Sequence, residues 1–234
     1  MGCRTIRQII VVTDGHANLG HSPVEAARAA FNRGVTVSAV GILDGGHLGD
    51  RGRREVEKIA AAGGGVADCV ASPDLSKTLH AVTWQATQCT LNMIINQELK
   101  RITGLPWNEL RPDKRAGVID LMAGLADSLN IQIALLLDTS ASMTGKMPAV
   151  LRSVQDLILS LQERKGETNI LVARYPGGER VLEVIAGCAD FCWDNLRPAG
   201  RTPTGPAILE ALGMMTGNQV KLKEHPRPAL DAVL

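Results

Sequence analysis

The apolar residues of the amino-terminal third fall into short β-branched runs separated by segments of helical character. Continuous runs of this kind, without polar alternation, are typical of parallel strands buried on both faces. We expect three such strands, at residues 9–13, 35–43 and 66–71. Ser22 and Pro23 mark a helix start, with serine as the cap and proline at the first helical position, and Gly34 marks its end. A charged helix is expected at about 51–62.

The middle of the chain has helical periodicity in two segments. Apolar residues recur at helical spacing from residue 75 to about 102, and the stretch GLPWNELRPD then interrupts the pattern. A second helical pattern follows, with apolar positions at Val118, Ile119, Met122, Leu125 and Leu129. We interpret residues 74–130 as a helical bridge.

The most apolar strand of the chain is expected in the carboxyl-terminal half, at residues 131–138, and its composition predicts a place at the sheet centre. A helix should follow at 147–161. Two further strands, at 169–175 and 180–186, bracket PGGE and predict a hairpin with one antiparallel edge strand. A last helix follows GRTPTG, with Thr204 or Gly205 as its cap, before a short strand-like tail.

Strands alternating with helices in this way predict an α/β fold. We expect a doubly wound, mostly parallel sheet with helices on both faces.

Polar residues stand where the most apolar strand opens into a loop. Asp138, Ser140 and Ser142 occupy alternate positions there, so that one carboxylate and two hydroxyls can converge. These hard oxygen donors suit magnesium or manganese and disfavour zinc or copper. Taken singly, such residues also cap helices and form turns, which is the alternative interpretation.

Two other segments carry matching oxygen donors, and together they resemble a known family. DTSASM supplies Asp138, Ser140 and Ser142, GRTPTG supplies Thr202, and VVTDG supplies Asp14. This set resembles the metal-ion-dependent adhesion site (MIDAS) of the von Willebrand factor A (VWA) domain, a Rossmann-like fold. In that family the segment like VVTDG comes last, whereas here it comes first.

The order of the segments implies a circular permutation of the VWA domain. Residues 131–234 would form the family's amino-terminal half, residues 1–73 its carboxyl-terminal half, and residues 74–130 the bridge, within a single domain 1–234. The tail RPALDAVL and the opening RTIRQIIVVTDG look like two versions of the approach to one strand. Joining the original termini is plausible because domain termini often lie close together.

The resemblance implies a binding module rather than an enzyme. By this resemblance, Ser140, Ser142 and Thr202 contact Mg²⁺ or Mn²⁺ directly or through one water, while Asp138 and Asp14 hold coordinating waters. A protein partner would fill the remaining position with an Asp or Glu carboxylate, giving a metal-dependent protein–protein interaction. A specificity rim is expected from neighbouring loop residues, namely Asp44, His47, Asp50, His16 and Arg201.

The composition excludes several classes of partner. Lys and Arg total 25 against 24 Asp and Glu, so the chain has no general attraction for nucleic acid or anionic membranes. No apolar run has the length needed to cross a bilayer, and the amino terminus lacks a signal peptide's apolar segment. We therefore expect a cytoplasmic protein. We also expect a monomer, because a permuted single chain needs fewer assumptions than an exchange of halves between copies.

Two alternatives remain open. LLLDTSASM superficially resembles the strand-end nucleophile of haloacid-dehalogenase-type phosphatases, which would make the protein a phosphate-ester hydrolase. In those enzymes a second aspartate acts as general acid and base two residues later, where this chain has Ser140. The second alternative is a half-domain-swapped dimer, in which two copies of a tandem fragment complete each other's sites.

Overall fold

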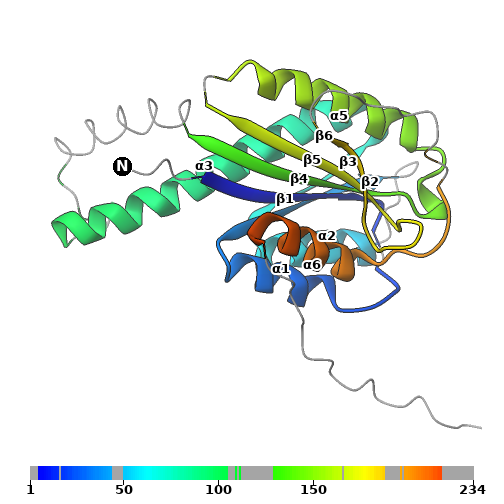
Figure 1. Cartoon of the computed structure of the whole chain (residues 1–234), viewed down its shortest axis with the longest axis horizontal. Helices are drawn as coiled ribbons and strands as arrows, with labels where there is room; N and C mark the ends of the chain where they lie inside the picture. The colour runs from blue at the N-terminus through cyan, green and yellow to red at the C-terminus, as the bar shows by residue number, and fades with distance from the viewer. Residues whose placement is uncertain are drawn as a thin grey trace, which may run out of the picture.

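The strands of the protein form one sheet of six. The computed structural model describes residues 5–15, 17–43, 50–104, 109, 111, 129–164, 166–187, 196 and 198–217. The strands are β1 (Thr5–Thr13), β2 (Val35–Leu43), β3 (Gly64–Ala71), β4 (Asn130–Asp138), β5 (Thr168–Tyr175) and β6 (Glu183–Gly187). Their order is β3-β2-β1-β4-β5-β6 (Figure 1). All neighbours are parallel except β5 and β6, which are antiparallel at the edge.

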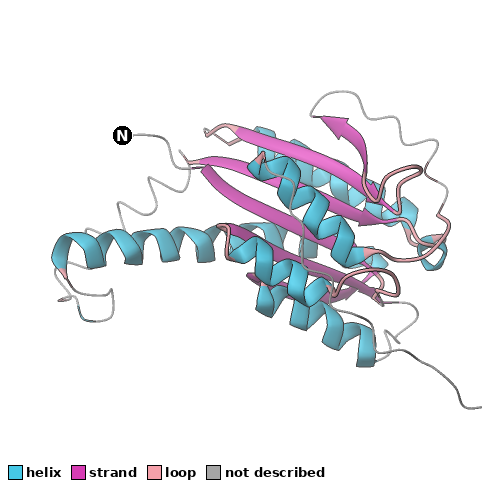
Figure 2. Cartoon of the chain, turned by 60° about the horizontal axis from the view of Figure 1, so that its bottom comes forward, coloured by secondary structure: helices cyan, strands magenta, loops and turns pink. Residues whose placement is uncertain are grey.

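Helices cover both faces of this sheet (Figure 2). The described helices are α1 (Pro23–Phe31), α2 (Asp50–Ala62), α3 (Leu75–Thr103), α5 (Met147–Gln162) and α6 (Thr204–Thr216), with short 3₁₀ turns η1 (Ser72–Asp74) and η3 (Ala141–Met143). Helices α3 and α5 pack on one face, and α1, α2 and α6 pack on the other. The predicted fold class is therefore confirmed, including the antiparallel edge strand and the central position of β4.

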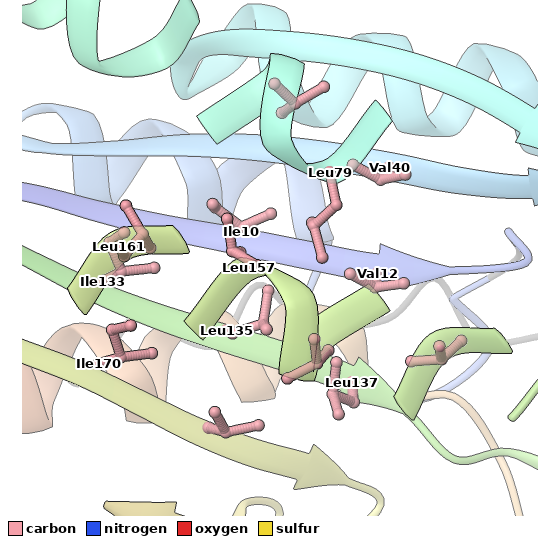
Figure 3. Close-up of a cluster of buried hydrophobic side chains, with 14 of the residues drawn as sticks. Ile10, Val12, Val40, Leu79, Ile133, Leu135, Leu137, Leu157, Leu161 and Ile170 are labelled. Carbon is pink, nitrogen blue, oxygen red and sulfur yellow. The ribbon is translucent and has the colours of Figure 1, made fainter. Parts of the chain in front are cut away.

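The two faces are packed with side chains of different size. The face under α3 and α5 is filled by large aliphatic residues such as Ile133, Leu135 and Leu157 (Figure 3). The opposite face is rich in alanine, with Ala26, Ala30 and others buried under α1, α2 and α6. Small side chains let those helices approach the strands closely.

The sheet changes direction of winding between β1 and β4. The helix that follows β1 covers one face, whereas the helix that follows β4 covers the other. In open α/β sheets, such a switch in strand order leaves a crevice beyond the carboxyl ends of the two strands, where ligands bind. The residues just after Thr13 and Asp138 therefore occupy the position at which a ligand site is expected.

Helix α3 belongs to the core for much of its 29 residues. Leu75, Leu79 and Leu91 are buried against the sheet, and the helix then extends past the amino ends of the strands (Figure 1). The predicted bridge thus begins with a helix of the packed layer, while its second predicted helix lies largely outside the described residues. Among the described helices, none is both long enough and apolar enough to cross a membrane.

Several predicted boundaries differ from the structure. Strand β3 begins at Gly64 and β6 at Glu183, whereas residues 66 and 180 were expected. The cap expected for the last helix is wrong, because Thr204 and Gly205 lie inside α6 and Pro203 precedes it. Gly205 is needed for packing, since a Cβ there would lie 2.0 Å from the His21 carbonyl oxygen. The strand-like tail lies outside the described residues.

The cap of the first predicted helix is confirmed. Ser22 precedes α1, and its hydroxyl accepts a hydrogen bond from the Glu25 backbone N–H at 3.5 Å.

Candidate metal centre

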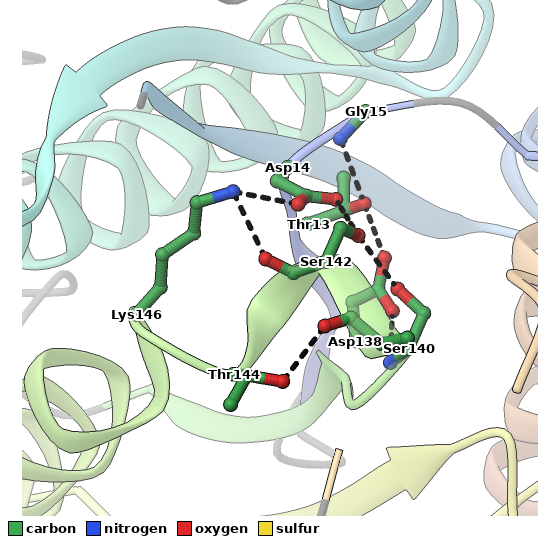
Figure 4. Close-up of polar contacts among 9 residues, drawn as sticks. Thr13, Asp14, Gly15, Asp138, Ser140, Ser142, Thr144 and Lys146 are labelled. Atoms are coloured by element: carbon green, nitrogen blue, oxygen red, sulfur yellow. Dashed lines mark hydrogen bonds and ion pairs between the residues drawn. The ribbon is translucent and has the colours of Figure 1, made fainter. Parts of the chain in front are cut away.

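Two carboxylates from opposite halves of the chain meet at the switch point of the sheet. Asp138 ends β4, and Asp14 follows directly after β1, the strand that pairs with β4 in parallel. The Thr13 hydroxyl donates a hydrogen bond of 2.6 Å to Asp138 Oδ2, which ties the two strand ends together (Figure 4). The tertiary structure therefore brings together residues separated by more than half of the sequence.

Asp138 is a carboxylate with no solvent exposure. Its second oxygen, Oδ1, accepts a hydrogen bond from the Ser140 backbone N–H at 2.8 Å. Burial raises the pKa of this carboxyl above its ordinary value of 3.8, and the hydrogen bonds from Thr13 and Ser140 oppose that rise. The nearby charge of Asp14 raises the pKa further. Keeping the Asp138 carboxyl ionised in the folded protein therefore costs free energy.

Ser142 bonds to Asp14 directly, and Ser140 is linked to Asp14 through Ser142. The Ser142 hydroxyl donates to Asp14 Oδ1 at 3.0 Å, and the hydroxyl oxygens of Ser140 and Ser142 lie 3.2 Å apart. The four residues Asp14, Asp138, Ser140 and Ser142 thus form one continuous polar group (Figure 4). Their oxygen atoms face a common region at the carboxyl end of the sheet.

Local backbone geometry explains how these side chains are aimed. Gly15 has φ of 90°, a conformation that favours glycine, and its N–H donates to the Thr13 hydroxyl at 3.1 Å. A Cβ on Gly15 would also lie 2.9 Å from the Gly52 Cα of α2. On the other strand, the turn η3 is closed by the Met143 N–H donating to the Ser140 carbonyl, with Met143 fully buried. Both turns are therefore fixed by packing.

Thr202 lies in a loop at the same end of the sheet. Its backbone N–H donates to Asn18 Oδ1 at 2.9 Å, and its carbonyl accepts from the Asn18 N–H at 3.1 Å. In the same loop, the Ala199 N–H donates to the Thr139 carbonyl beside Asp138. These bonds dock the loop onto the segment that follows β1 and onto the end of β4. In the described part of the chain, the hydrogen bonds of Thr202 involve its backbone, and its hydroxyl makes none with the other four predicted ligands.

Lys146 is a residue of this site that the sequence interpretation did not include. Its Nζ lies 2.6 Å from Asp14 Oδ2 and 3.3 Å from the Ser142 carbonyl oxygen. The side chain is 5% exposed, so the ion pair is buried. The spacing of four residues from Ser142 was a possible signal. The partner Asp14, however, is 132 residues away, and no local pattern identifies it.

The predicted rim is only partly described. Arg201 is exposed and lines a polar hollow of about 370 Å³ together with residues 17–23. Asp50 is the first residue of α2. His16, Asp44 and His47 lie outside the described residues.

The donor set fits a hard cation better than a soft one. Across the residues that the structure describes, no group of three or more His, Cys, Asp and Glu side chains gathers as a metal site. The candidate ligands here are instead carboxylates and hydroxyls, which Mg²⁺ and Mn²⁺ prefer.

The electrostatics of the site also favour a cation. The hydrogen bonds that Asp138 receives within the described residues come from neutral donors, a hydroxyl and an amide. A buried carboxylate with neutral partners is stabilised by a nearby cation. Tyr175, which pairs with Asp138 in the sheet, has its pKa raised well above the usual range by burial and by this charge.

Comparisons with known proteins place the chain among bacterial relatives. It is 37% identical over 214 residues to Bacillus subtilis (strain 168) "Uncharacterized protein YabS", covering 88% of this chain and 87% of that protein. The crystal structure of an uncharacterized protein from Alicyclobacillus acidocaldarius subsp. acidocaldarius DSM 446 matches with a TM-score of 0.85 and 39% identity, over 91% of this chain and 94% of that one. No family model matches the chain.

Proposed function

We propose a metal-dependent protein-binding function for this chain, which belongs to the same family as Bacillus subtilis YabS. Mg²⁺, or Mn²⁺, would be held at the carboxyl end of β1 and β4 by Asp138, Ser140, Ser142, Thr202 and Asp14. The ion would supply a positive charge with one coordination position open to a partner's Asp or Glu carboxylate. Binding of this kind requires no bond cleavage, so the protein would act as a recognition module.

The observation that carries this proposal is the buried environment of the Asp138 carboxylate. The carboxylate is fully buried at the ligand-binding position of the sheet, its pKa is raised, and its described hydrogen bonds come from neutral groups. A second carboxylate and two hydroxyls lie next to it. Oxygen donors concentrated in this way around a costly negative charge suit a hard divalent cation.

The sheet order is compatible with the proposed permutation of a VWA-like fold. Read from β4 to α6 and then from β1 to α3, the strands take the order 3-2-1-4-5-6 from the opposite edge. This is the same doubly wound order that the chain shows when it is read from its amino terminus. Moving one half ahead of the other therefore leaves the switch point unchanged. One chain also pairs β1 with β4 directly, so no exchange of halves between copies is needed to form the sheet.

The geometry favours the phosphatase alternative less than the metal-dependent binding function. A nucleophilic aspartate must reach the phosphorus atom of its substrate. Asp138 instead has no exposure, and its two oxygens accept hydrogen bonds of 2.6 and 2.8 Å.

Thermal unfolding with and without metal tests the proposal. We expect Mg²⁺ to raise the melting temperature of the wild type, because a ligand at about 100 times its Kd stabilises a protein by about 2.7 kcal/mol. Asp138→Ala should abolish this rise. Asp156→Ala is the matched control, since Asp156 is an exposed carboxylate on α5 bonded to Ser76. A wild-type melting curve unchanged by both Mg²⁺ and Mn²⁺ would contradict the proposal.

Capture of partners tests the recognition role. The wild-type protein should retain a protein from cell extract in Mg²⁺ and release it in EDTA, and Asp138→Ala should retain none. Retention that is equal in Mg²⁺ and EDTA would mean that the partner binds elsewhere on the molecule.

A further inference from the structure

The positive charge of Lys146 is built into the candidate metal centre. Its ammonium group pairs with Asp14 Oδ2 at 2.6 Å and also contacts the Ser142 carbonyl oxygen at 3.3 Å. The side chains of Lys146 and Asp14 are 5% and 9% exposed. Water therefore screens this charge weakly, and it acts directly on the neighbouring oxygen donors.

The backbone holds Lys146 in a fixed place. It precedes α5, where its carbonyl accepts hydrogen bonds from the Ala149 and Val150 N–H groups. Its own N–H donates to the Met143 carbonyl, at the end of the turn that carries Ser140 and Ser142. The lysine is thus anchored between the serine turn and the following helix, with its side chain directed at Asp14 (Figure 4).

The two carboxylate oxygens of Asp14 have different partners. Oδ2 is bound to the ammonium group of Lys146, and Oδ1 accepts from the Ser142 hydroxyl. Only Oδ1 is therefore directed to the hydroxyl side of the site. Lys146 fixes the orientation of this carboxylate and offsets its charge.

From this arrangement we infer that Lys146 sets the charge balance of the site, so that the metal-loaded site requires an anionic partner group. This inference rests on the proposed function. Among the described residues of the centre, Asp14 and Asp138 carry two negative charges, and Lys146 reduces their net charge to minus one. A divalent cation then leaves the site at plus one, which a single carboxylate neutralises. Without Lys146, the loaded site would be neutral and would attract a carboxylate less.

The inference predicts opposite effects on metal and on carboxylate when the lysine charge is removed. Mn²⁺ binding is measured by electron paramagnetic resonance on the wild type, Lys146→Met, Lys146→Gln and Lys146→Arg. Both neutral variants should bind Mn²⁺ on the order of tenfold more tightly, because a repelling charge has gone. Lys146→Arg should remain close to the wild type. Lys146→Gln keeps a hydrogen-bond donor for Asp14, so it separates the loss of charge from the loss of the bond.

Acetate serves as the probe for a partner carboxylate. Its displacement of water from bound Mn²⁺ is followed by water proton relaxation, with sodium chloride at equal ionic strength as the control. The neutral variants should require several-fold more acetate than the wild type or Lys146→Arg. Circular dichroism in the presence of Mn²⁺ checks that each variant is folded.

The outcomes separate this inference from the proposed function. If the wild type binds Mn²⁺ and the folded neutral variants bind it equally or more weakly, Lys146 has a structural role and the inference is wrong. Equal acetate affinities in all four proteins would also overturn it. If none of the four proteins binds Mn²⁺, the metal site itself is wrong and the inference fails with it.

Discussion

Two polar clusters of this protein differ in the hydrogen bonds that they make. The site cluster consists of Asp14, Asp138, Ser140, Ser142 and Lys146. The threonine cluster lies between α3 and the sheet and consists of Gln8, Thr36, Thr83, Thr87 and Thr90. The site cluster is charged and stands at the carboxyl ends of strands, whereas the threonine cluster is neutral and lies nearer their amino ends.

The threonines are satisfied by their own helix. The hydroxyls of Thr83, Thr87 and Thr90 each donate to the carbonyl four residues earlier, at 2.7 to 2.9 Å. Thr87 also accepts from Gln8 Nε2 at 2.8 Å, and Thr90 contacts Thr36 at 3.0 Å. This cluster contains no carboxylate, so it offers a cation no negative charge. The site cluster, by contrast, contains the carboxylates of Asp14 and Asp138, which hard divalent cations prefer as ligands.

The largest expected difference concerns the ion pair of the site cluster. Asp14→Asn should lower the free energy of unfolding by about 3–5 kcal/mol, because it leaves the Lys146 charge buried without its carboxylate. The double variant Asp14→Asn/Lys146→Met should recover most of this loss. Denaturant unfolding of metal-free protein measures both. Equal stability of the single and double variants would show that the pair is not coupled.

The threonine cluster should matter for stability alone. Thr87→Val removes the hydroxyl that accepts from Gln8, and the loss of a buried partner should cost about 1–3 kcal/mol. Mn²⁺ affinity should stay at the wild-type value. A change in metal binding would mean that the two clusters communicate through β1.

Removal of a hydroxyl from the site cluster should weaken metal binding and leave stability nearly unchanged. Ser142 is exposed, so Ser142→Ala should change the unfolding free energy by less than about 0.5 kcal/mol. Its loss as a ligand should weaken Mn²⁺ binding on the order of tenfold, a difference of about 1.4 kcal/mol. Isothermal titration calorimetry gives the affinity. Wild-type affinity in this variant would remove Ser142 from the ligand set.

The smallest expected effect is a pH dependence that the neutral cluster lacks. The pKa of Asp138 is raised in the folded protein, so folded protein binds its proton more tightly than unfolded protein does. The contribution of Asp138 to stability is therefore fully present below its ordinary pKa of 3.8 and is lost as pH rises through the raised value. Asp138→Asn removes this titration. The stability of metal-free wild type relative to Asp138→Asn should thus fall as pH rises, and a constant difference would contradict the assignment.

The fold could be predicted largely from the sequence because its signals are local. β-branched runs gave the core strands, and the PGGE segment gave the antiparallel edge pair between β5 and β6. The Ser22 cap of α1 is also a local signal. The start of α6 was misplaced because Pro203, which has no side-chain capping group, stands at the cap position in place of Thr204 or Gly205.

The oxygen donors of the candidate site could be predicted from the sequence, but Lys146, the counterion of Asp14, could not. Asp138, Ser140 and Ser142 could be selected because they follow a buried strand, and the resemblance to the VWA metal site added Asp14. Whether Thr202 joins them depends on a loop that is docked by Asn18. The pairing of Lys146 with Asp14 has no signal of its own.

The sequence by itself determined the strands, most of the helices, and the oxygen-rich ends of β1 and β4. Only the tertiary structure decided the counterion, because the parallel pairing of β1 with β4 sets Asp14 against Lys146 as well as Ser142. The physical reason is the sequence separation over which each signal acts. Hydrophobic periodicity and turn chemistry act between residues a few positions apart, whereas the charge balance of the site arises from groups that meet only when the two halves of the sheet pair.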